Sequence, residues 1–279
     1  MKGKLFWLII ALIVIAVIFS VVGNNGKGAE NFKPLEIEVG DEFTYIGYDN
    51  TMYVLNYAMA DVTGDEVKDM IMMIGEKENL SSTSAKNIDV VIYDLTEEKF
   101  YNLKLKKYEG EAQRIETYDM TGDGILDIIL KVNDANGDVS IRVISMQNME
   151  FKEIFKAKDN KGITFTGNFL DGFKAYIKNS KYGKEVNLNL QDRKENYISK
   201  GFFDEAGRLL KSDVKISTTG FKSVEIVQLD GYFGFQTTQR IIGFDEEDLL
   251  EEITSIWKYE NGKWNLKESK GENIGNLLY

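Results

Sequence analysis

A nine-residue acidic segment occurs twice in this chain, 58 residues apart. The first copy reads Asp-Val-Thr-Gly-Asp-Glu-Val-Lys-Asp over 61–69, and the second reads Asp-Met-Thr-Gly-Asp-Gly-Ile-Leu-Asp over 119–127. Each copy places aspartates at positions 1, 5 and 9, a threonine at position 3 and a glycine at position 4. Recurring units of this size indicate a repeat architecture, because one small sheet cannot bury its faces alone. The repeat restricts the fold more than any other feature.

Both copies have the composition of a calcium loop. Carboxylates crowded into nine residues repel one another unless a cation lies among them, and calcium takes six to eight oxygen ligands at flexible geometry. For the second copy we predict four side-chain ligands and one carbonyl ligand, namely Asp119, Thr121, Asp123 and Asp127 with the carbonyl of Ile125. The alternative interpretation is a solvated acidic β-turn.

The first copy departs from the pattern at two positions. Its corresponding ligands are Asp61, Thr63, Asp65 and Asp69 with the carbonyl of Val67. Glu66 stands where the second copy has Gly124, and a side chain there makes a positive φ cost about 1 kcal/mol. Lys68 adds a positive charge beside the loop. We therefore expect weaker ion binding in this copy, with an empty loop as the alternative.

Apolar strand patterns surround both acidic segments. One strand precedes each segment, one follows it and a further one comes next, over 52–60, 70–75 and 87–95 in the first unit and 112–118, 128–132 and 138–146 in the second. Alternating β-branched and aromatic residues favour strands in these stretches. Each unit is therefore predicted to be an antiparallel meander with the acidic loop in its first turn.

Two weaker echoes of the unit follow, at 167–177 and 227–235, each reading strand, Asp-Gly, strand. Counting them, we predict an all-β fold over residues 35–279, a β-propeller-like array of about four antiparallel blades. The dipeptide Asn261-Gly262 predicts a type I′ hairpin turn. Residues 134–138 begin like a further acidic segment, but Arg142 stands where the last aspartate would be. A hairpin turn therefore explains these residues. Residues 245–253 suggest a short helix, and their acidic side chains a solvated face.

The segments Asp-x-Thr-Gly-Asp-Gly-x-x-Asp, followed by alternating apolar strands, resemble the FG-GAP/VCBS-type repeats of integrin-α-like β-propellers. The resemblance covers roughly residues 50–150; over 160–279 only the general layout of bacterial repeat proteins is similar. It implies an extracellular protein whose blades carry structural Ca²⁺. The chain is short for seven blades, so a four-bladed, five-bladed or incomplete version is expected.

The N-terminus has the pattern of a membrane-targeting element. Lys2 and Lys4 precede an uncharged apolar run over residues 5–23, which is long enough to cross a bilayer at about 1.5 Å per residue. We predict a single-pass anchor in the cell membrane, with the C-terminal domain outside. The alternative is a signal segment cleaved near Gly23, which would release a secreted protein. Residues 24–34 are expected to form a linker.

The composition excludes several classes of chemistry. The chain contains no cysteine and no histidine, so disulfides, thiol nucleophiles and the Ser-His-Asp mechanism are ruled out. Its formal net charge is −11, which argues against binding to nucleic acid.

These features favour a non-enzymatic binding or adhesion module, whose partner is an unknown protein or polysaccharide at the cell envelope. The aromatic residues Tyr232, Phe233 and Phe235 are candidate contacts, with core packing as the alternative. The second hypothesis is a carboxylate-dependent carbohydrate-active enzyme on a propeller scaffold, because two Asp or Glu side chains suffice for glycoside hydrolysis. The third hypothesis is a spacer or assembly partner at the envelope.

Overall fold

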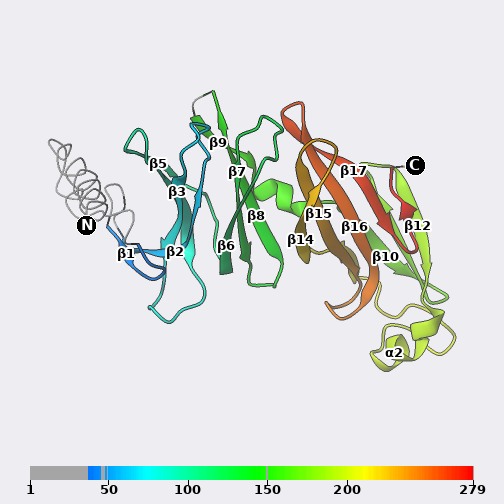
Figure 1. The fold of residues 1–279 in the computed structure, drawn as a ribbon. Coiled ribbons are helices and arrows are strands. Elements are labelled where there is room, and N and C mark those ends of the chain that lie inside the picture. Colours follow the sequence, from blue (N-terminus) through cyan, green and yellow to red (C-terminus); the bar gives the residue numbers. More distant parts are fainter. Residues whose placement is uncertain (1–36, 45–47, 49, 149, 279) are drawn as a thin grey trace, which may run out of the picture.

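The computed structural model describes residues 37–44, 48, 50–148 and 150–278. Figure 1 shows that these residues form antiparallel sheets that follow one another in chain order from one end of the molecule to the other. The predicted membrane segment, 1–23, and the predicted linker, 24–34, lie outside the described residues. Within the part that is described, no helix is long and apolar enough to cross a membrane.

The first two sheets are meanders whose strands pair in the order of the sequence. The first contains β1 (Glu42–Phe43), β2 (Met52–Ala60), β3 (Asp69–Glu76), β4 (Lys86–Asp94) and β5 (Lys99–Leu103). The second contains β6 (Glu111–Tyr118), β7 (Asp127–Asn133), β8 (Val139–Gln147) and β9 (Glu150–Phe155). The acidic segments join β2 to β3 and β6 to β7, so the predicted meanders and the place of both loops are confirmed.

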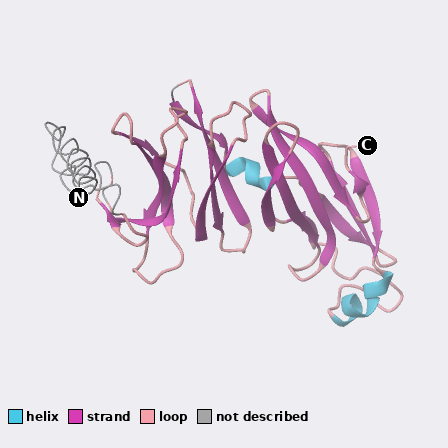
Figure 2. Ribbon diagram, viewed as in Figure 1, coloured by secondary structure: helices cyan, strands magenta, loops and turns pink. Residues whose placement is uncertain are grey.

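The third sheet is larger, with nine strands in the described residues. Its strands are β10 (Thr166–Leu170), β11 (Lys174–Asn179), β12 (Lys184–Asn189), β13 (Lys215–Thr218), β14 (Ser223–Gln228), β15 (Phe233–Ile242), β16 (Leu249–Glu260), β17 (Lys263–Gly271) and β18 (Gly275–Asn276). The described residues also form three short helices, η2 (Ala157–Lys161), η3 (Gln191–Arg193) and α2 (Lys194–Ser199), which Figure 2 shows together with the strands. The predicted all-β, antiparallel class is therefore confirmed.

The two weak echoes of the repeat belong to one sheet. They form the hairpins β10–β11 and β14–β15, both within the nine-stranded sheet. Between them, β13 pairs with β10 on one side and with β15 on the other. The described chain therefore contains one five-stranded sheet, one four-stranded sheet and one larger sheet. The sequence suggested four similar units.

The three sheets pack face to face through separate apolar layers. In β7, Ile128 and Leu130 belong to the layer shared with the first sheet, whereas Ile129 belongs to the layer shared with the third sheet. Successive side chains of a strand point to opposite faces. A central strand covered on both faces must therefore be apolar at nearly every position, which explains the unbroken hydrophobic runs in β3 and β7.

The third sheet encloses an aromatic core of its own. Phe169 contacts Tyr197 from α2 and Phe203 from the following loop, with ring centroids 5.6 and 6.2 Å apart. Phe202 and Phe244 stack at 4.4 Å in the same region. These rings bury the face of the sheet that lies away from the repeats.

One predicted turn is confirmed and one predicted helix is wrong. Asn261 and Gly262 have φ values of 54° and 75°, as a type I′ turn requires. Residues 245–248 form a turn, and β16 begins at Leu249. The carboxylate of Asp245 accepts the backbone N–H of residues 247 and 248, so the chain turns, and burial of Leu250 and Ile253 against the sheet then favours a strand.

Candidate metal loops

The aspartate at position 1 folds both acidic loops in the same way. Asp61 accepts the backbone N–H of Gly64 on Oδ1 at 2.7 Å and that of Glu66 on Oδ2 at 2.9 Å. Asp119 accepts the corresponding N–H groups of residues 122 and 124 at 2.6 and 3.0 Å. Two different sequences thus give one loop geometry, held by the carboxylate at its start.

The aspartate at position 9 is buried in both loops. Asp69 and Asp127 are the first residues of β3 and β7 and are 0% and 1% exposed. Each uses Oδ2 to accept the N–H groups of positions 2 and 3, at 2.9 and 3.1 Å in the first loop and 2.7 and 3.0 Å in the second. Burial raises the pKa of both carboxyls, that of Asp127 to about 6, because the charged form is poorly solvated there.

The aspartate at position 5 is exposed and forms a local turn. Asp65 accepts the N–H of Val67 at 2.8 Å, and Asp123 accepts that of Ile125 at 3.0 Å. The loop carboxylates are therefore directed at the loop's own amides. Over the described ranges, no group of three or more acidic side chains is gathered closely enough to hold a metal ion.

Two buried oxygens in these loops lack a partner. Asp69 Oδ1 and Thr121 Oγ1 make no hydrogen bond within the described residues. Both atoms belong to side chains that the sequence predicts as ligands, and every predicted ligand atom is an oxygen. Because a buried polar atom without a partner costs free energy, an ion that these oxygens could contact would stabilise the loops. The donor chemistry thus fits a hard cation such as Ca²⁺.

The predicted strain in the first loop is confirmed. Glu66 has a φ of 69°, and Gly124 at the same loop position has a φ of 88°. The residue with this left-handed conformation carries a side chain in the first loop and is a glycine in the second. The conformation therefore costs more free energy in the first loop.

The two loops lie against one another, and the second also contacts the third sheet. A Cβ added to Gly64 would lie 2.8 Å from Cδ1 of Ile125, and one added to Gly122 would lie 2.8 Å from Cδ1 of Tyr232. The N–H of Phe233 donates to the carbonyl of Asp119 at 3.1 Å. In each loop, the glycine at position 4 therefore leaves space for a side chain from the neighbouring unit, which is Ile125 for the first loop and Tyr232 for the second.

This contact accounts for the position of the aromatic residues at 232–235, which the sequence indicates as candidate contacts for a partner. Phe235 is fully buried, and Tyr232 and Phe233 are half-buried between the second loop and the third sheet. The rings of Tyr118 and Phe233 lie 4.9 Å apart. The core-packing alternative is therefore confirmed for these residues.

Sequence reasoning missed Asp94, which lies beside the first loop. It ends β4, is 3% exposed and further raises the pKa of Asp69, for which burial is the largest cause. An aspartate that closes an apolar strand before a turn was visible in the sequence. Its position opposite Asp69 became clear only with the register of β3 and β4.

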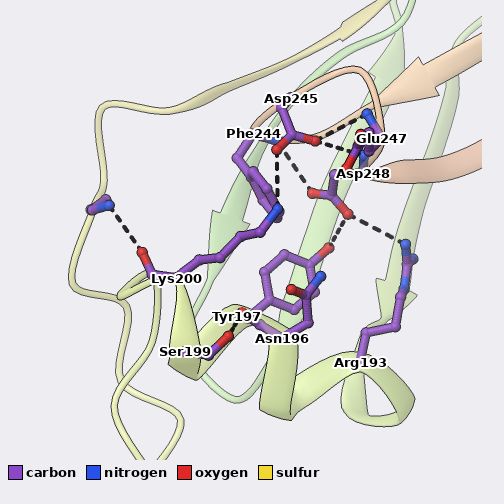
Figure 3. Close-up of polar contacts among 10 residues, drawn as sticks. Arg193, Asn196, Tyr197, Ser199, Lys200, Phe244, Asp245, Glu247 and Asp248 are labelled. Carbon is purple, nitrogen blue, oxygen red and sulfur yellow. Dashed lines mark hydrogen bonds and ion pairs between the residues drawn. The ribbon is translucent and has the colours of Figure 1, made fainter.

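A second polar cluster lies in the third sheet (Figure 3). Asp248 Oδ1 accepts a hydrogen bond from the hydroxyl of Tyr197 at 2.7 Å and one from Arg193 at 3.3 Å. Glu251 accepts the backbone N–H groups of residues 272 and 273 at 2.9 and 2.8 Å. Asp248 and Glu251 are each 4% exposed, so the prediction of a solvated acidic face is wrong for both. Their neighbours supply hydrogen bonds that make burial tolerable.

We predict that Tyr197→Phe lowers the free energy of unfolding by about 1.5–3 kcal/mol at pH 7, because it removes a hydrogen bond to a buried charge. Burial raises the pKa of Asp248 above 3.8, and the Tyr197 hydroxyl opposes this shift. Because the pKa is raised on folding, protonation of Asp248 stabilises the folded state below pH 3.8. This stabilisation is lost as the pH rises through the pKa of the folded state. The variant should raise that pKa further, so its loss should be larger at pH 7 than at pH 4.

Urea unfolding at both pH values measures this effect. Tyr57→Phe is the matched control, since Tyr57 is 43% exposed. An equal loss at the two pH values would show that the hydroxyl does not interact with an ionised Asp248.

The third sheet is the part of the chain that matches a protein family. Residues 163–271 match the family model of the YybI C-terminal domain. The sequence matches none of the curated proteins. The crystal structure of exotype rhamnogalacturonan lyase YesX is similar at 12% identity and a TM-score of 0.33, over 80% of this chain and 34% of that one. This chain spans about a third of the length of the lyase. The segment from β10 through β17 is thus similar to the YybI C-terminal domain.

Proposed function

We propose that this chain is a membrane-anchored, extracytoplasmic repeat protein whose acidic loops bind structural Ca²⁺, and that it serves as a non-enzymatic binding or adhesion module at the cell envelope. The observation that carries the calcium assignment is the pair of buried, unpartnered oxygens, Asp69 Oδ1 and Thr121 Oγ1, in two loops of the same geometry. The anchor is residues 5–23, and the partner is a protein or polysaccharide of the envelope.

The ion would be held within each loop by the oxygens that the sequence predicts. In the second loop these come from Asp119, Thr121, Asp123, Asp127 and the carbonyl of Ile125, and the first loop offers the corresponding five. When bound, calcium supplies positive charge among carboxylates that otherwise repel. Calcium sites of extracellular modules have dissociation constants of about 10⁻⁴–10⁻³ M, which suits a structural role in a calcium-containing medium.

We further propose that the repeats are FG-GAP/VCBS-type blades of a propeller-like array. Two features support this: the first two meanders pack face to face, and their loops contact one another through Gly64 and Ile125. The contact between Gly122 and Tyr232 adds the β14–β15 hairpin as the next member of the series.

The carbohydrate-active alternative has one feature in its favour. An open groove of 880 Å³ runs along β16, β17 and β18. It is lined by Glu251, Glu252, Glu268 and Glu272 and by Arg193 from η3. However, Glu251 already accepts two backbone N–H groups, and Glu268 forms an ion pair with Lys270 at 3.4 Å. The groove therefore supports catalysis less well than the loops support calcium binding.

The calcium assignment predicts a melting temperature that depends on calcium. For a site with a dissociation constant near 1 mM, 10 mM calcium adds about 1.4 kcal/mol, or about 3–6 °C in a domain of this size. Thermal unfolding of the full-length chain in detergent, with calcium and with chelator, measures the shift. Asp123→Ala should reduce it, because one ligand of the second loop is lost.

Magnesium at the same concentration is the control for ionic strength and for non-specific divalent binding. Equal melting temperatures in calcium and chelator, for both the native chain and Asp123→Ala, would contradict the proposal and leave the loops as acidic turns.

A further inference from the structure

A second buried carboxylate faces the first loop. Met70 of β3 pairs with Tyr93 of β4 in an antiparallel ladder, so Asp69 and Asp94 occupy the next opposed positions. Residues directly opposite one another in such a ladder have Cβ atoms about 4.5–5.5 Å apart. Asp69 is 0% and Asp94 is 3% exposed. Two carboxylates therefore share a small buried space where the ladder ends.

The described side chains give this pair no positively charged partner, although Asp69 Oδ2 accepts a hydrogen bond from the hydroxyl of Thr63 at 3.1 Å. Buried charges are normally paired or coordinate a metal, and like charges directly opposite one another are destabilising. Within residues 50–148, neither carboxylate forms an ion pair with a lysine or arginine. Lys99 pairs with Asp94 across β4–β5, but its ammonium lies over the ring of Tyr101, 4.3 Å from the centroid. Asp69 Oδ1 also lacks a hydrogen bond among these residues.

Asp94 is held in place by the turn that follows it. Its Oδ1 accepts the N–H groups of residues 96 and 97 at 2.9 and 2.8 Å. The carboxylate is thus fixed beside Asp69 by backbone contacts and does not depend on an ion for its position.

The second loop has no such carboxylate at this place. Ile128 pairs with Ile144 in the ladder of β7 and β8, so Asp127 is opposed by Ser145, a neutral hydroxyl. The loops also differ at Glu66 and Lys68, which stand where the second loop has Gly124 and Leu126. The exchange of aspartate for serine is the difference in charge among the buried side chains opposite the position-9 carboxylate.

We propose that Asp94 supplies the first loop with an additional carboxylate ligand, so that residues 61–69 bind calcium more tightly than residues 119–127. The inference rests on the proposed calcium binding and reverses the order expected from the sequence, where Glu66 and Lys68 weaken the first loop. The number of charged ligands is one of the two properties that set the affinity of calcium loops, and here it favours the first.

Calorimetric titration of the full-length chain with calcium chloride tests the order. Asp123→Ala removes an exposed ligand of the second loop and leaves the first to be measured, and Asp65→Ala does the reverse. Asp94→Asn is then added to the first background, because asparagine keeps the oxygen that accepts the turn N–H groups and removes the charge. Ser145→Asp is added to the second background and gives that loop the carboxylate of the first.

The first loop should bind calcium about tenfold more tightly than the second, Asp94→Asn should weaken it about tenfold, and Ser145→Asp should tighten the second loop. Unchanged affinity of the first loop in Asp94→Asn would overturn the inference and leave the calcium proposal standing. Should that variant fail to fold, a second loop that Ser145→Asp does not tighten would overturn it equally. Absence of calcium binding in the native chain would overturn both.

Discussion

Arg142→Ala is expected to lower the free energy of unfolding by about 2–4 kcal/mol, because it truncates a buried side chain and leaves its half-buried partner Glu153 without an ion pair. The Arg142 side chain is 2% exposed, and its Nε lies 2.9 Å from Oε1 of Glu153. Its guanidinium also lies over the ring of Tyr108, 4.7 Å from the centroid. Tyr108 belongs to the segment that connects the first sheet to the second, so the arginine fixes this connection as well as its own strand.

Chemical denaturation of the full-length chain measures this loss. Arg208→Ala is the matched control, since its side chain is 74% exposed and pairs with Asp204 four residues away. Exposed pairs of this kind contribute less than about 1 kcal/mol. Similar losses for the two variants would mean that the ion pair of Arg142 is solvated and contributes little to the second sheet.

Arg142 also shows what the sequence can reveal. It stands where a further acidic segment would have its last aspartate, and the sequence therefore assigned residues 134–138 to a turn. The structure confirms that turn through hydrogen bonds of Asp134 to the N–H groups of residues 136 and 138. What the arginine does instead depends on Glu153, which lies on the neighbouring strand β9, and on Tyr108, which lies in the segment that connects the first two sheets. Neither contact can be read from the acidic pattern.

The first two sheets were predictable because their contacts are local. Each strand pairs with the next one in sequence, and the turn chemistry of Asp61 and Asp119 acts within five residues. The periodicity of the chain and the repeat of the acidic segment were therefore sufficient to locate three strands and the loop of each unit within one or two residues. The fourth strand of each unit, β5 and β9, was not predicted.

The third sheet was less predictable because its pairings are not local. Strand β13 joins β10 to β15, and this connection merges two weak repeats into one sheet. The burial of Asp248 depends in the same way on Tyr197, which is 51 residues away. A charged side chain that the sequence pattern places on the surface becomes buried when a distant element packs over it. The local sequence pattern contains no information about that contact.

Contacts between the second and third sheets also come from residues that sequence patterns describe poorly. Lys131 extends from β7 to donate to the carbonyl of Val224 at 3.3 Å and forms an ion pair with Glu116 at 2.8 Å. Asp138 accepts the N–H of Gly220 at 2.8 Å and pairs with Lys222. These charged side chains fix the two sheets together at the ends of an otherwise apolar layer.

The contact of the second loop with the third sheet leads to a prediction of similar size. Gly122→Ala should lower the free energy of unfolding by about 2–4 kcal/mol. Its φ of 78° costs an alanine about 1 kcal/mol, and its Cβ would lie 2.8 Å from the ring of Tyr232. Relief of such overpacking typically costs a further 1–3 kcal/mol. The ring cannot move freely, because its hydroxyl donates to the carbonyl of Tyr259 at 3.0 Å.

Gly124→Ala separates the two causes, because it changes a glycine of the same loop with a φ of 88° and no atom within 4 Å of the added Cβ. It should cost only about 1 kcal/mol. Tyr232→Ala combined with Gly122→Ala should recover the part that comes from the clash, as a double-mutant cycle would measure. Equal losses for the two glycine variants would show that the loop does not support the third sheet through Tyr232. A larger loss at Gly122 that disappears without the tyrosine would establish that the acidic loop is a joint between the repeats and the C-terminal sheet.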